Sequence, residues 1–322
     1  MLIDQQIAVI SDLDITQVPK GTISRFWFHI VTDGMGMPVY IPVIVARGEG
    51  DGPVLGLTAA LHGNELNGIL VIQRLFQKID ISQLSGTIVG IPVVNVPSLL
   101  RKKRRFPDGT DLNHIMPGKP EGNVSQVYAW RLVHQIVKEF DLLIDLHTAS
   151  FGRINSYYIR ADMEDPTVCR MAWLQQAQII VHNPPNDGTL RGTAGEMKIA
   201  AITLEVGDPN MIQKGMVRDG LTGVFNLLYD FNMLPGKVDP PAEPAVLCHN
   251  SYWLYTDTGG IVTVHPQVTE RVKKGQVVAT LRNIFGDLIK EYIAPEDGIV
   301  IGKSVHPVAQ SGARILHLGI PE

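Results

Sequence analysis

Apolar and polar positions alternate in blocks along the first two thirds of the chain. Four short, nearly continuous apolar runs predict strands that are buried on both faces of a sheet. Between them, apolar residues recur every three or four positions at 69–79 and 127–140, which predicts amphipathic helices. Strands that alternate with helices predict an α/β fold, with a layered sheet and helices on both faces. The predicted strands are Val54–Leu61, Thr87–Val94, Leu142–Leu146 and Ala200–Leu204.

Each of these strands is followed at once by a polar side chain. The four residues in question are His62, Asn95, His147 and Glu205. In open α/β sheets, ligands bind beyond the carboxyl ends of the strands, close to a reversal of strand order. We therefore expect these four side chains to meet at one edge of the sheet.

Three of the polar residues near this edge have the chemistry of a metal site. A catalytic zinc needs three protein ligands and one open position for water. His62 and Glu65 lie three positions apart on one turn, where both can face a common point, and His147 arrives from another strand. Each residue alone would suit a structural role, such as a helix N-terminus for Glu65. Together they predict a metal site, and Gly63 is expected to let the backbone turn tightly between the first two.

The amino-acid composition and periodicity of the chain change near residue 234. A proline-dense stretch at 236–244 cannot continue a helix and predicts a semi-rigid linker. It divides the chain into a predicted catalytic domain at 1–235 and an all-β module at 245–322. The module has two similar halves, around Gly260 and Gly298, and resembles the barrel-sandwich of biotinyl and lipoyl domains. The turn between the halves, Gly286-Asp287, lacks the lysine of a carrier domain, so a lid, a dimer surface or a rim of the active site is expected instead.

Composition narrows the class of protein. The chain of 322 residues is 45% hydrophobic and 19% charged, which predicts a substantial core. Its net charge of −4 argues against a nucleic-acid binder, and the basic run at 101–105 is read as a solvated loop. No apolar stretch is long enough for a membrane span, and the first residues lack a secretory signal pattern. Cys169 and Cys248 have no metal spacing and indicate reduced thiols, so a cytoplasmic location is expected.

Four ordered motifs carry a family resemblance. They are His62-x-x-Glu65, Asp111-Leu112-Asn113, Asp145-Leu146-His147 and Thr203-Leu204-Glu205-Val206-Gly207. Together they resemble the succinylglutamate desuccinylase/aspartoacylase family, a branch of the zinc carboxypeptidase-like hydrolases. The resemblance covers about residues 50–235 and implies a zinc-carboxypeptidase-like mixed sheet, followed by a C-terminal β module.

The resemblance also implies roles for individual residues. His62, Glu65 and His147 would bind one Zn²⁺ per chain, and Glu205 would act as general base and acid. An arginine after the Asn95 segment would stabilise the oxyanion. Arg104 and Arg105 both lie near the matching position, and Arg104, nine residues after Asn95, is favoured. Asp111 and Asp145 are candidates for orienting an arginine or a ligand histidine.

The expected substrate contacts depart from the family pattern at one position. Asn95 and Asn113 are expected to contact the substrate, but the chain has His114 where the family has an arginine. Histidine does not replace the bidentate fork that arginine offers to a carboxylate. Three readings stay open: His114 binds the carboxylate as imidazolium, another arginine such as Arg160 substitutes, or the substrate lacks that carboxylate.

These expectations define a predicted function and its alternatives. The first is a zinc-dependent amide hydrolase that releases an acyl group from an N-acyl amino acid or related amine by metal-activated water. The second is a zinc carboxypeptidase that acts on short peptides. The third is a non-catalytic metal-binding or sensor protein, against which Glu205 argues because a sensor needs no proton shuttle. The expected partner is a small-molecule substrate of the N-acyl amino acid type, and the sequence leaves open whether the chain forms a homo-oligomer.

Overall fold

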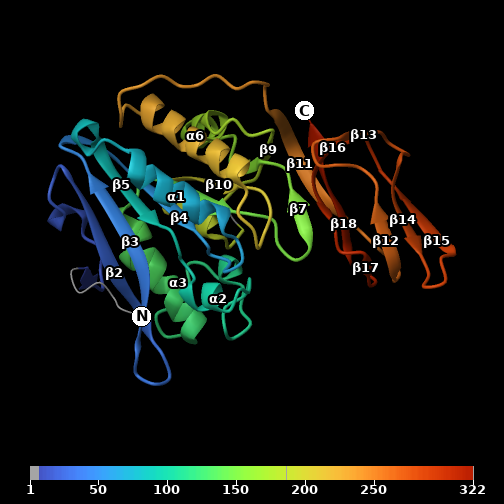
Figure 1. The fold of residues 1–322 in the computed structure, drawn as a ribbon, viewed down its shortest axis with the longest axis horizontal. Coiled ribbons are helices and arrows are strands. Elements are labelled where there is room, and N and C mark those ends of the chain that lie inside the picture. Colours follow the sequence, from blue (N-terminus) through green and yellow to red (C-terminus); the bar gives the residue numbers. More distant parts are fainter. Residues whose placement is uncertain (1–6, 186, 322) are drawn as a thin grey trace.

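The computed structural model describes residues 7–185 and 187–321 (Figure 1). The N-terminal stretch 1–6, inspected above for a targeting signal, lies outside the described residues. The α-helices are α1 (Asn67–Lys78), α2 (Val96–Leu100), α3 (Val124–Gln135), α4 (Pro166–Leu174), α5 (Leu190–Glu196) and α6 (Lys214–Asp230). The strands up to the proline-rich segment are β1 (Ala8–Ile10), β2 (Thr22–Thr32), β3 (Pro38–Arg47), β4 (Gly50–Ala59), β5 (Ser85–Ile91), β6 (Leu142–His147), β7 (Arg153–Asn155), β8 (Tyr158–Ala161), β9 (Ile179–His182) and β10 (Ala200–Glu205). Those after it are β11 (Val246–Tyr255), β12 (Gly260–Val264), β13 (Arg271–Val272), β14 (Val277–Arg282), β15 (Leu288–Ile293), β16 (Gly298–Ser304), β17 (Val308–Ala309) and β18 (Arg314–Pro321).

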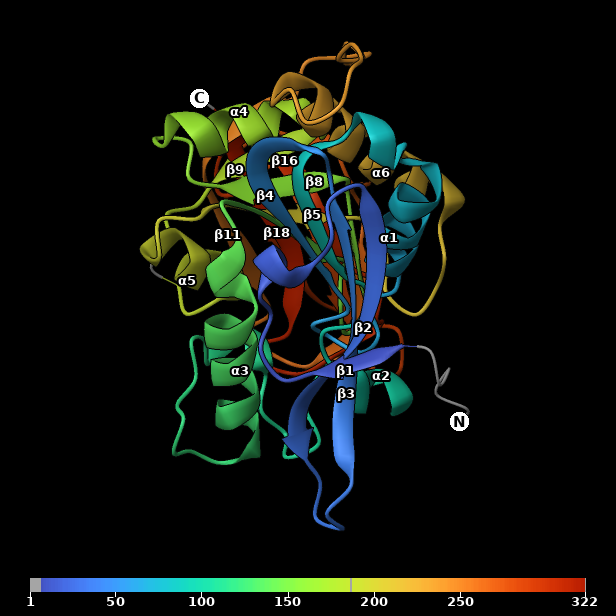
Figure 2. The same cartoon turned by 90° about the vertical axis from the view of Figure 1, so that its left-hand side faces the viewer.

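The centre of the large sheet confirms the predicted α/β architecture. Strands β5, β4, β6 and β10 lie side by side and run parallel, as their apolar sequences indicate. Helices α1, α4 and α6 pack on one face over a core of buried aliphatic side chains, and α3 and α5 pack on the other. Figures 1 and 2 show α1 and α6 together on one side of the sheet and α3 on the opposite side. The sheet is mixed, because β3 and β8 pair antiparallel with β5 and β10.

Strand order reverses beside β4. From β4 the chain passes through α1 to β5 on one side of that strand, and β6 lies on its other side. The carboxyl ends of β4 and β6 therefore flank the kind of crevice in which α/β sheets bind ligands. His62 follows the first of these strands and His147 ends the second.

The end of β4 differs in detail from the predicted strand. The strand stops at Ala59 rather than Leu61, because Ala60 adopts a left-handed backbone conformation with φ of 50°. Gly63 does not have a positive φ, so it does not serve the tight turn that was expected of it. Instead, a Cβ atom at this position would lie 2.1 Å from the carbonyl carbon of Ser98. Glycine is required here because the first turn of the His62 loop rests against the backbone of α2.

The large sheet continues past the proline-rich segment. Among the described residues it includes 14 strands, and its order from β9 onward is β11, β18, β16 and β13. A second, antiparallel sheet of β15, β14, β12 and β17 packs against this extension (Figure 1). β7 pairs with β16 and so joins the catalytic part to the β module. None of the described helices has the length and apolar character needed to cross a membrane.

Candidate metal centre and catalytic cavity

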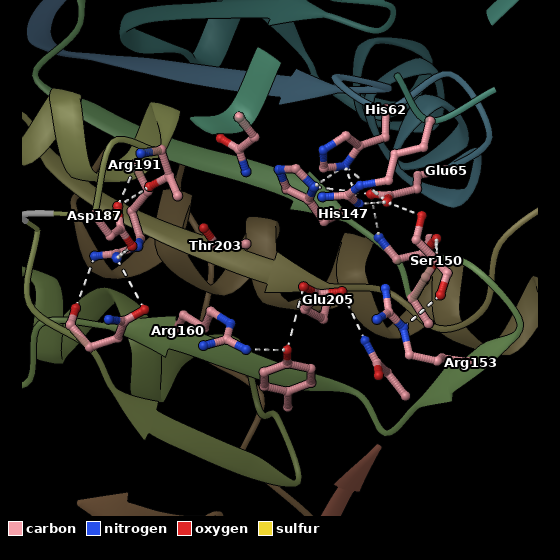
Figure 3. A pocket seen from close by; sticks show the side chains of 18 of the residues that line it. His62, Glu65, His147, Ser150, Arg153, Arg160, Asp187, Arg191, Thr203 and Glu205 are labelled. Carbon is pink, nitrogen blue, oxygen red and sulfur yellow. Dashed lines mark hydrogen bonds and ion pairs between the residues drawn. The ribbon is translucent and has the colours of Figure 1, made fainter. Parts of the chain in front are cut away.

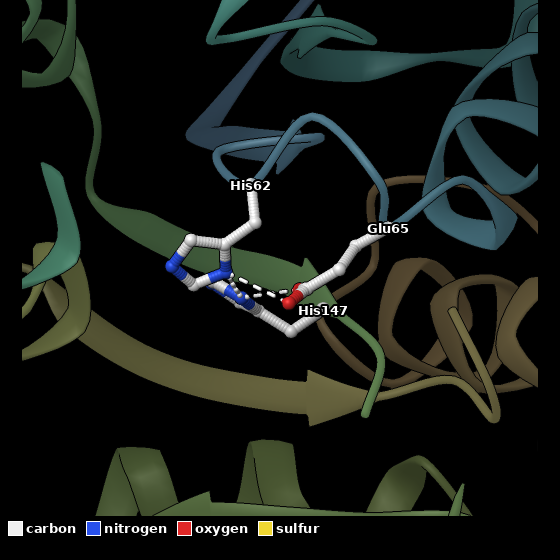
Figure 4. A group of neighbouring side chains, drawn as sticks. All are labelled: His62, Glu65 and His147. Atoms are coloured by element: carbon white, nitrogen blue, oxygen red, sulfur yellow. Dashed lines mark hydrogen bonds and ion pairs between the residues drawn. The ribbon is translucent and has the colours of Figure 1, made fainter. Parts of the chain in front are cut away.

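Three buried side chains converge at the crevice between β4 and β6. The Nδ1 atom of His62 lies 2.9 Å from Oε1 of Glu65, and the Nδ1 atom of His147 lies 3.0 Å from Oε2 of the same carboxylate. The two imidazole Nδ1 atoms are 3.2 Å apart. Figure 4 shows the three side chains pointing to a common point, His62 and Glu65 from one loop and His147 from the end of β6.

Two carboxylates on the far sides of the imidazoles orient these ligands. The Nε2 atom of His147 donates to Asp145 over 2.7 Å, and the Nε2 atom of His62 donates to Asp111 over 3.0 Å. Thr58 in turn donates to Asp145 over 2.7 Å. Because a carboxylate accepts these bonds, each imidazole carries its hydrogen on Nε2 and presents a lone pair on Nδ1. Histidine ligands in metalloenzymes are held in this way.

The chemistry of the donor set fits a divalent cation. Two Nδ1 lone pairs and one carboxylate face the same point, and all three are acceptors that require a positive partner. Burial opposes ionisation of Glu65, yet His62 and His147 together lower the pKa of this carboxyl well below its usual range. A set of two histidines and one glutamate is typical of catalytic zinc, although such sites accept other divalent ions.

The loop after β6 also holds the Glu65 carboxylate in place. Its carboxylate accepts a hydrogen bond from the backbone N–H of Thr148 at 3.1 Å and from the Ser150 hydroxyl at 2.8 Å. Both donors lie within three residues after His147 in the sequence. The segment that supplies one ligand thus also sets the position of another.

Sheet register places Glu205 next to the metal ligands. Glu205 pairs with His147 on one side and with Tyr158 of the antiparallel strand β8 on the other. Residues opposite each other in a sheet point to the same face, so the three side chains form a row across β6, β10 and β8. The carboxylate of Glu205 accepts a 3.1 Å hydrogen bond from the Asn155 amide and faces the Tyr158 hydroxyl at 3.5 Å.

The pKa of the Glu205 carboxyl is raised, as is common for a group that accepts and returns a proton. Burial raises the pKa of its carboxyl, and the negative charge of Glu65 acts in the same direction, whereas His147 and Arg160 oppose the change. Catalytic carboxylates are commonly tuned upward by burial so that they can both accept and return a proton.

These residues line one cavity of about 360 Å³. Figure 3 shows the metal-ligand cluster at one side of it, Glu205 near the centre, and Arg191 with Asp187 at the far end. Arg160 and Arg153 flank Glu205 on either side in this view. A second row across the sheet, from Asp145 through Thr203 to Arg160, brings the last of these arginines into the cavity.

The two candidates for the oxyanion arginine, Arg104 and Arg105, have different surroundings in the structure. Arg104 lines the cavity and donates from Nη1 to Glu65 at 3.0 Å and to Nδ1 of His62 at 3.1 Å, while its Nε donates to Asp111 at 2.9 Å. Arg105 is exposed and donates to the carbonyl of Gly109. Only the first of the two is therefore placed to act on a group bound at the ligand cluster.

The predicted substrate contacts fall into two groups. Asn113, His114 and Arg160 line the cavity. Asn95 is not brought to it, because its buried amide donates to the carbonyl of Leu61 and accepts from the N–H of Ser98. Asn95 caps helix α2 and holds the loop that carries His62, so the structure gives it a structural contact in place of the expected substrate contact.

Several cavity residues were not among the predicted ones. The position of Tyr158 could have been predicted, because it lies two residues before Arg160 in a strand and both side chains must point to the same face of the sheet. Ser150, Arg153 and Asn155 follow His147 in a segment without periodicity. Trp253 and Arg314 reach the cavity from β11 and β18, and nothing in their local sequence indicates this.

Replacing Asp145 by asparagine is expected to weaken zinc binding by about 10- to 100-fold, because the carboxylate that fixes the His147 tautomer loses its charge. Competition with a fluorescent chelator measures the change. Asp219→Asn, an exposed aspartate on α6, serves as the matched control. Equal zinc affinity of the Asp145 variant and the wild type would show that this carboxylate does not support the metal site.

Comparisons with known proteins identify the family of the chain. The family model for the succinylglutamate desuccinylase/aspartoacylase catalytic domain matches residues 51–230. An N-alpha-acetyl-L-2,4-diaminobutyric acid deacetylase from Halomonas elongata is 27% identical over 282 residues, which cover 82% of this chain and 81% of that protein. A succinylglutamate desuccinylase from Pseudomonas paraeruginosa is 28% identical over 171 residues, 49% of this chain and 51% of the relative.

Solved structures share the fold. A succinylglutamate desuccinylase/aspartoacylase from Rhodobacter sphaeroides superposes with a TM-score of 0.87 at 21% identity, covering 97% of this chain and 99% of that one. The product-bound ectoine utilization protein EutE (DoeB) from Ruegeria pomeroyi gives a TM-score of 0.84 at 21% identity, with 92% and 95% covered. Since the family model spans more than half of the 322 residues, the chain belongs to the succinylglutamate desuccinylase/aspartoacylase family.

Proposed function

We propose that this protein is a zinc-dependent amide hydrolase that releases the acyl group from an N-acyl amino acid or a related amine. One observation carries the proposal: a three-ligand cluster and a carboxylate with a raised pKa share one cavity, held side by side by the register of β6 and β10. Membership of the family and the likeness to a deacetylase of N-acetylated diaminobutyric acid support the same reaction class.

Residues of the chain supply most of the proposed chemistry around the metal. His62, Glu65 and His147 would hold one zinc ion per chain, and this ion would lower the pKa of the attacking water and polarise the substrate carbonyl. Glu205 takes a proton from the attacking water and returns it to the nitrogen of the leaving amine. Asn155 and Tyr158 hold the Glu205 carboxylate in place during both transfers.

Arg104 is the residue that we assign to the developing oxyanion. Its guanidinium reaches the ligand cluster from the loop after α2, and Asp111 holds it while also orienting His62. A donor that is fixed before the reaction stabilises new negative charge without reorganising, which is the main source of electrostatic catalysis. Arg105 has no such position.

Among the three readings of the substrate carboxylate, the geometry favours Arg160. Its guanidinium lies in the cavity beside Glu205 and donates to the Tyr158 hydroxyl at 3.1 Å, and it pairs with no carboxylate among the described residues. Arg191, by contrast, is bound by Asp187 at 2.6 Å. Asn113 accepts from the N–H of Leu190, which leaves its amide N–H groups available to the substrate.

We further propose that residues 1–235 form the catalytic domain, 236–244 the linker and 245–322 a barrel-sandwich-like β module. The contact of Trp253 and Arg314 with the cavity supports the reading of this module as a rim of the active site.

A substrate panel tests the function. N-acetyl, N-succinyl and N-formyl amino acids, including the N-acetylated diaminobutyric acid of the relative, are compared with unmodified dipeptides at equal concentration. We expect release of free amine from at least one N-acyl amino acid, and cleavage of dipeptides alone would instead support the carboxypeptidase alternative. Binding of zinc without turnover of any amide would support the sensor alternative.

Arg160→Gln is expected to raise KM for the best substrate by about 10- to 100-fold with a smaller effect on kcat, because a charged hydrogen bond to the substrate is lost. Steady-state kinetics measure both constants. Arg218→Gln, an exposed arginine on α6, is the control. An unchanged KM would remove Arg160 from the substrate site.

A further inference from the structure

A second group of arginines lies where the β module meets the catalytic cavity. Arg153 comes from β7, whereas Arg314 begins β18, and both line the cavity. Both side chains lie close to the indole of Trp253 on β11: the guanidinium carbons of Arg153 and Arg314 are 5.4 and 5.1 Å from its ring centre. Two guanidinium groups thus share one aromatic side chain.

Within the described part of the chain, these two arginines form no ion pair with a carboxylate. Arg153 donates from Nε to the carbonyl of Ser150 at 2.7 Å, and its Nη groups donate to no residue that the structure describes. Among residues 7–185 and 187–321, neither Arg153 nor Arg314 forms an ion pair with a carboxylate. In the same cavity, Arg104 is paired with Glu65 and Asp111, and Arg191 with Asp187. The positive charge that the cavity leaves uncompensated is therefore concentrated at this end and at Arg160.

Holding like charges together is unfavourable unless a ligand compensates them. Burial lowers the pKa of Arg153 to about 10, and repulsion from Arg314 and Arg104 acts in the same direction. Cation–π contacts with Trp253 offset part of the repulsion. An anion between the two guanidinium groups would remove it, and the planar fork of arginine matches the two oxygens of a carboxylate.

The support beneath Trp253 is rigid. His317 is 2% exposed and stacks on the indole with ring centres 4.9 Å apart and planes 11° apart. Its Nε2 atom lies 3.0 Å from the Ser251 hydroxyl, and its ring meets Tyr158 edge-on. The indole is therefore held in one orientation before any ligand arrives, and its support also contacts the tyrosine beside Glu205.

From this arrangement we propose that Arg153 and Arg314, held by Trp253, form a clamp that binds a carboxylate of the substrate. The proposal rests on the proposed function and names residues that determine specificity, Arg314 and Trp253 from the β module and Arg153 from β7. The carboxylate has two possible sources, the acyl group or the amino acid, and the clamp chemistry is the same for both.

Titration with succinate tests the clamp without any turnover. Isothermal calorimetry on the zinc-loaded wild type is expected to show binding, weakened about 10- to 100-fold in Arg314→Gln and in Arg153→Gln, as for loss of a charged hydrogen bond. Arg271→Gln, an exposed arginine of the same module, should bind succinate like the wild type. Equal affinity in all four proteins, or no measurable binding to the wild type, would overturn the proposal even if the deacylase activity is confirmed.

Kinetics with three matched substrates then identify the source of the carboxylate. The set is the N-acetyl and N-succinyl derivatives of one neutral amino acid and the N-acetyl derivative of an acidic one. If Arg314→Gln raises KM only for the N-succinyl substrate, the clamp binds the carboxylate of the acyl group. If it raises KM only for the derivative of the acidic amino acid, the clamp binds the side-chain carboxylate of that amino acid. An equal rise for all three assigns it to the α-carboxylate, whereas unchanged KM values throughout contradict the clamp.

A conservative variant separates recognition from folding. Arg314→Lys keeps the positive charge but lacks the planar fork, so it is expected to recover only part of the succinate affinity lost in Arg314→Gln. Full recovery by lysine would reduce the clamp to a simple positive charge and so contradict bidentate recognition. Thermal denaturation of each variant shows whether the sheet around β18 remains folded.

Discussion

Glu205→Gln is expected to lower kcat by about 10²- to 10⁴-fold while the protein still binds zinc, because glutamine cannot accept a proton from the attacking water. The substitution preserves the size of the side chain and the hydrogen bond from Asn155. Steady-state kinetics on the best substrate of the panel, together with metal analysis of the same preparation, measure the two quantities.

A matched surface variant makes the result specific. Glu196→Gln changes an exposed glutamate on α5 and should leave kcat unaltered. Because burial raises the pKa of Glu205, this base loses its charge at a higher pH than an ordinary glutamate, and the wild-type rate should fall below that pKa. A Glu205→Gln enzyme with the kcat and pH profile of the wild type would remove the residue from the reaction.

His62→Ala is expected to lose zinc and activity together. Removing one of three ligands should weaken metal binding by more than the roughly 100-fold seen when only a supporting residue is changed. Metal analysis after dialysis should find about one zinc per chain in the wild type and much less in the variant. Treatment of the wild type with a chelator should abolish hydrolysis, and added zinc should restore it.

Protons are expected to compete with zinc for the same nitrogen. Although burial opposes protonation, Asp145 and Glu65 raise the pKa of His147 well above its usual value. Zinc must displace that proton, so its affinity should fall as the pH is lowered. His134→Ala on α3 is the control for loss of a histidine outside the site, and undiminished hydrolysis by zinc-free protein would refute the metal mechanism.

The convergence of the three candidate metal ligands could be anticipated because their positions follow from local rules. His62 and Glu65 share one turn, and His147 ends a strand whose apolar sequence identifies it as central. Parallel strands present their carboxyl ends at one edge of a sheet, so residues at three strand ends must approach one another. The same reasoning brings Glu205 to this edge, where it lines the cavity, and the alternation of side chains along β8 extends it to Arg160.

Loop positions did not follow from such rules. Arg104 and Arg105 are adjacent in a segment without periodicity, and only the contacts with Glu65 and Asp111 distinguish them. Asn95 was expected to follow its strand directly, but β5 ends at Ile91, and Asn95 turns back to cap α2. A polar residue at a strand end can satisfy its own loop instead of a ligand, and this choice depends on backbone geometry that local sequence does not encode.

The contribution of β-module residues to the cavity could not be predicted, for a different reason. Trp253 lies more than a hundred positions after His147, and Arg314 later still. Their approach to the cavity depends on the pairing of β11 with β9 and of β16 with β7, which joins the module to the catalytic part. Pairing between strands so distant in sequence has no local signature.

The place of β18 in the large sheet has a consequence for biosynthesis. This strand lies between β11 and β16, and its first residue, Arg314, lines the cavity. The metal ligands are translated within the first half of the chain, and domains generally fold from the N-terminus during synthesis. The ribosome must nevertheless extend the chain past residue 314 before the cavity wall is complete. On the proposed function, a nascent chain would acquire its candidate metal ligands well before its cavity wall is complete, and selective hydrolysis would begin only after β18 has inserted.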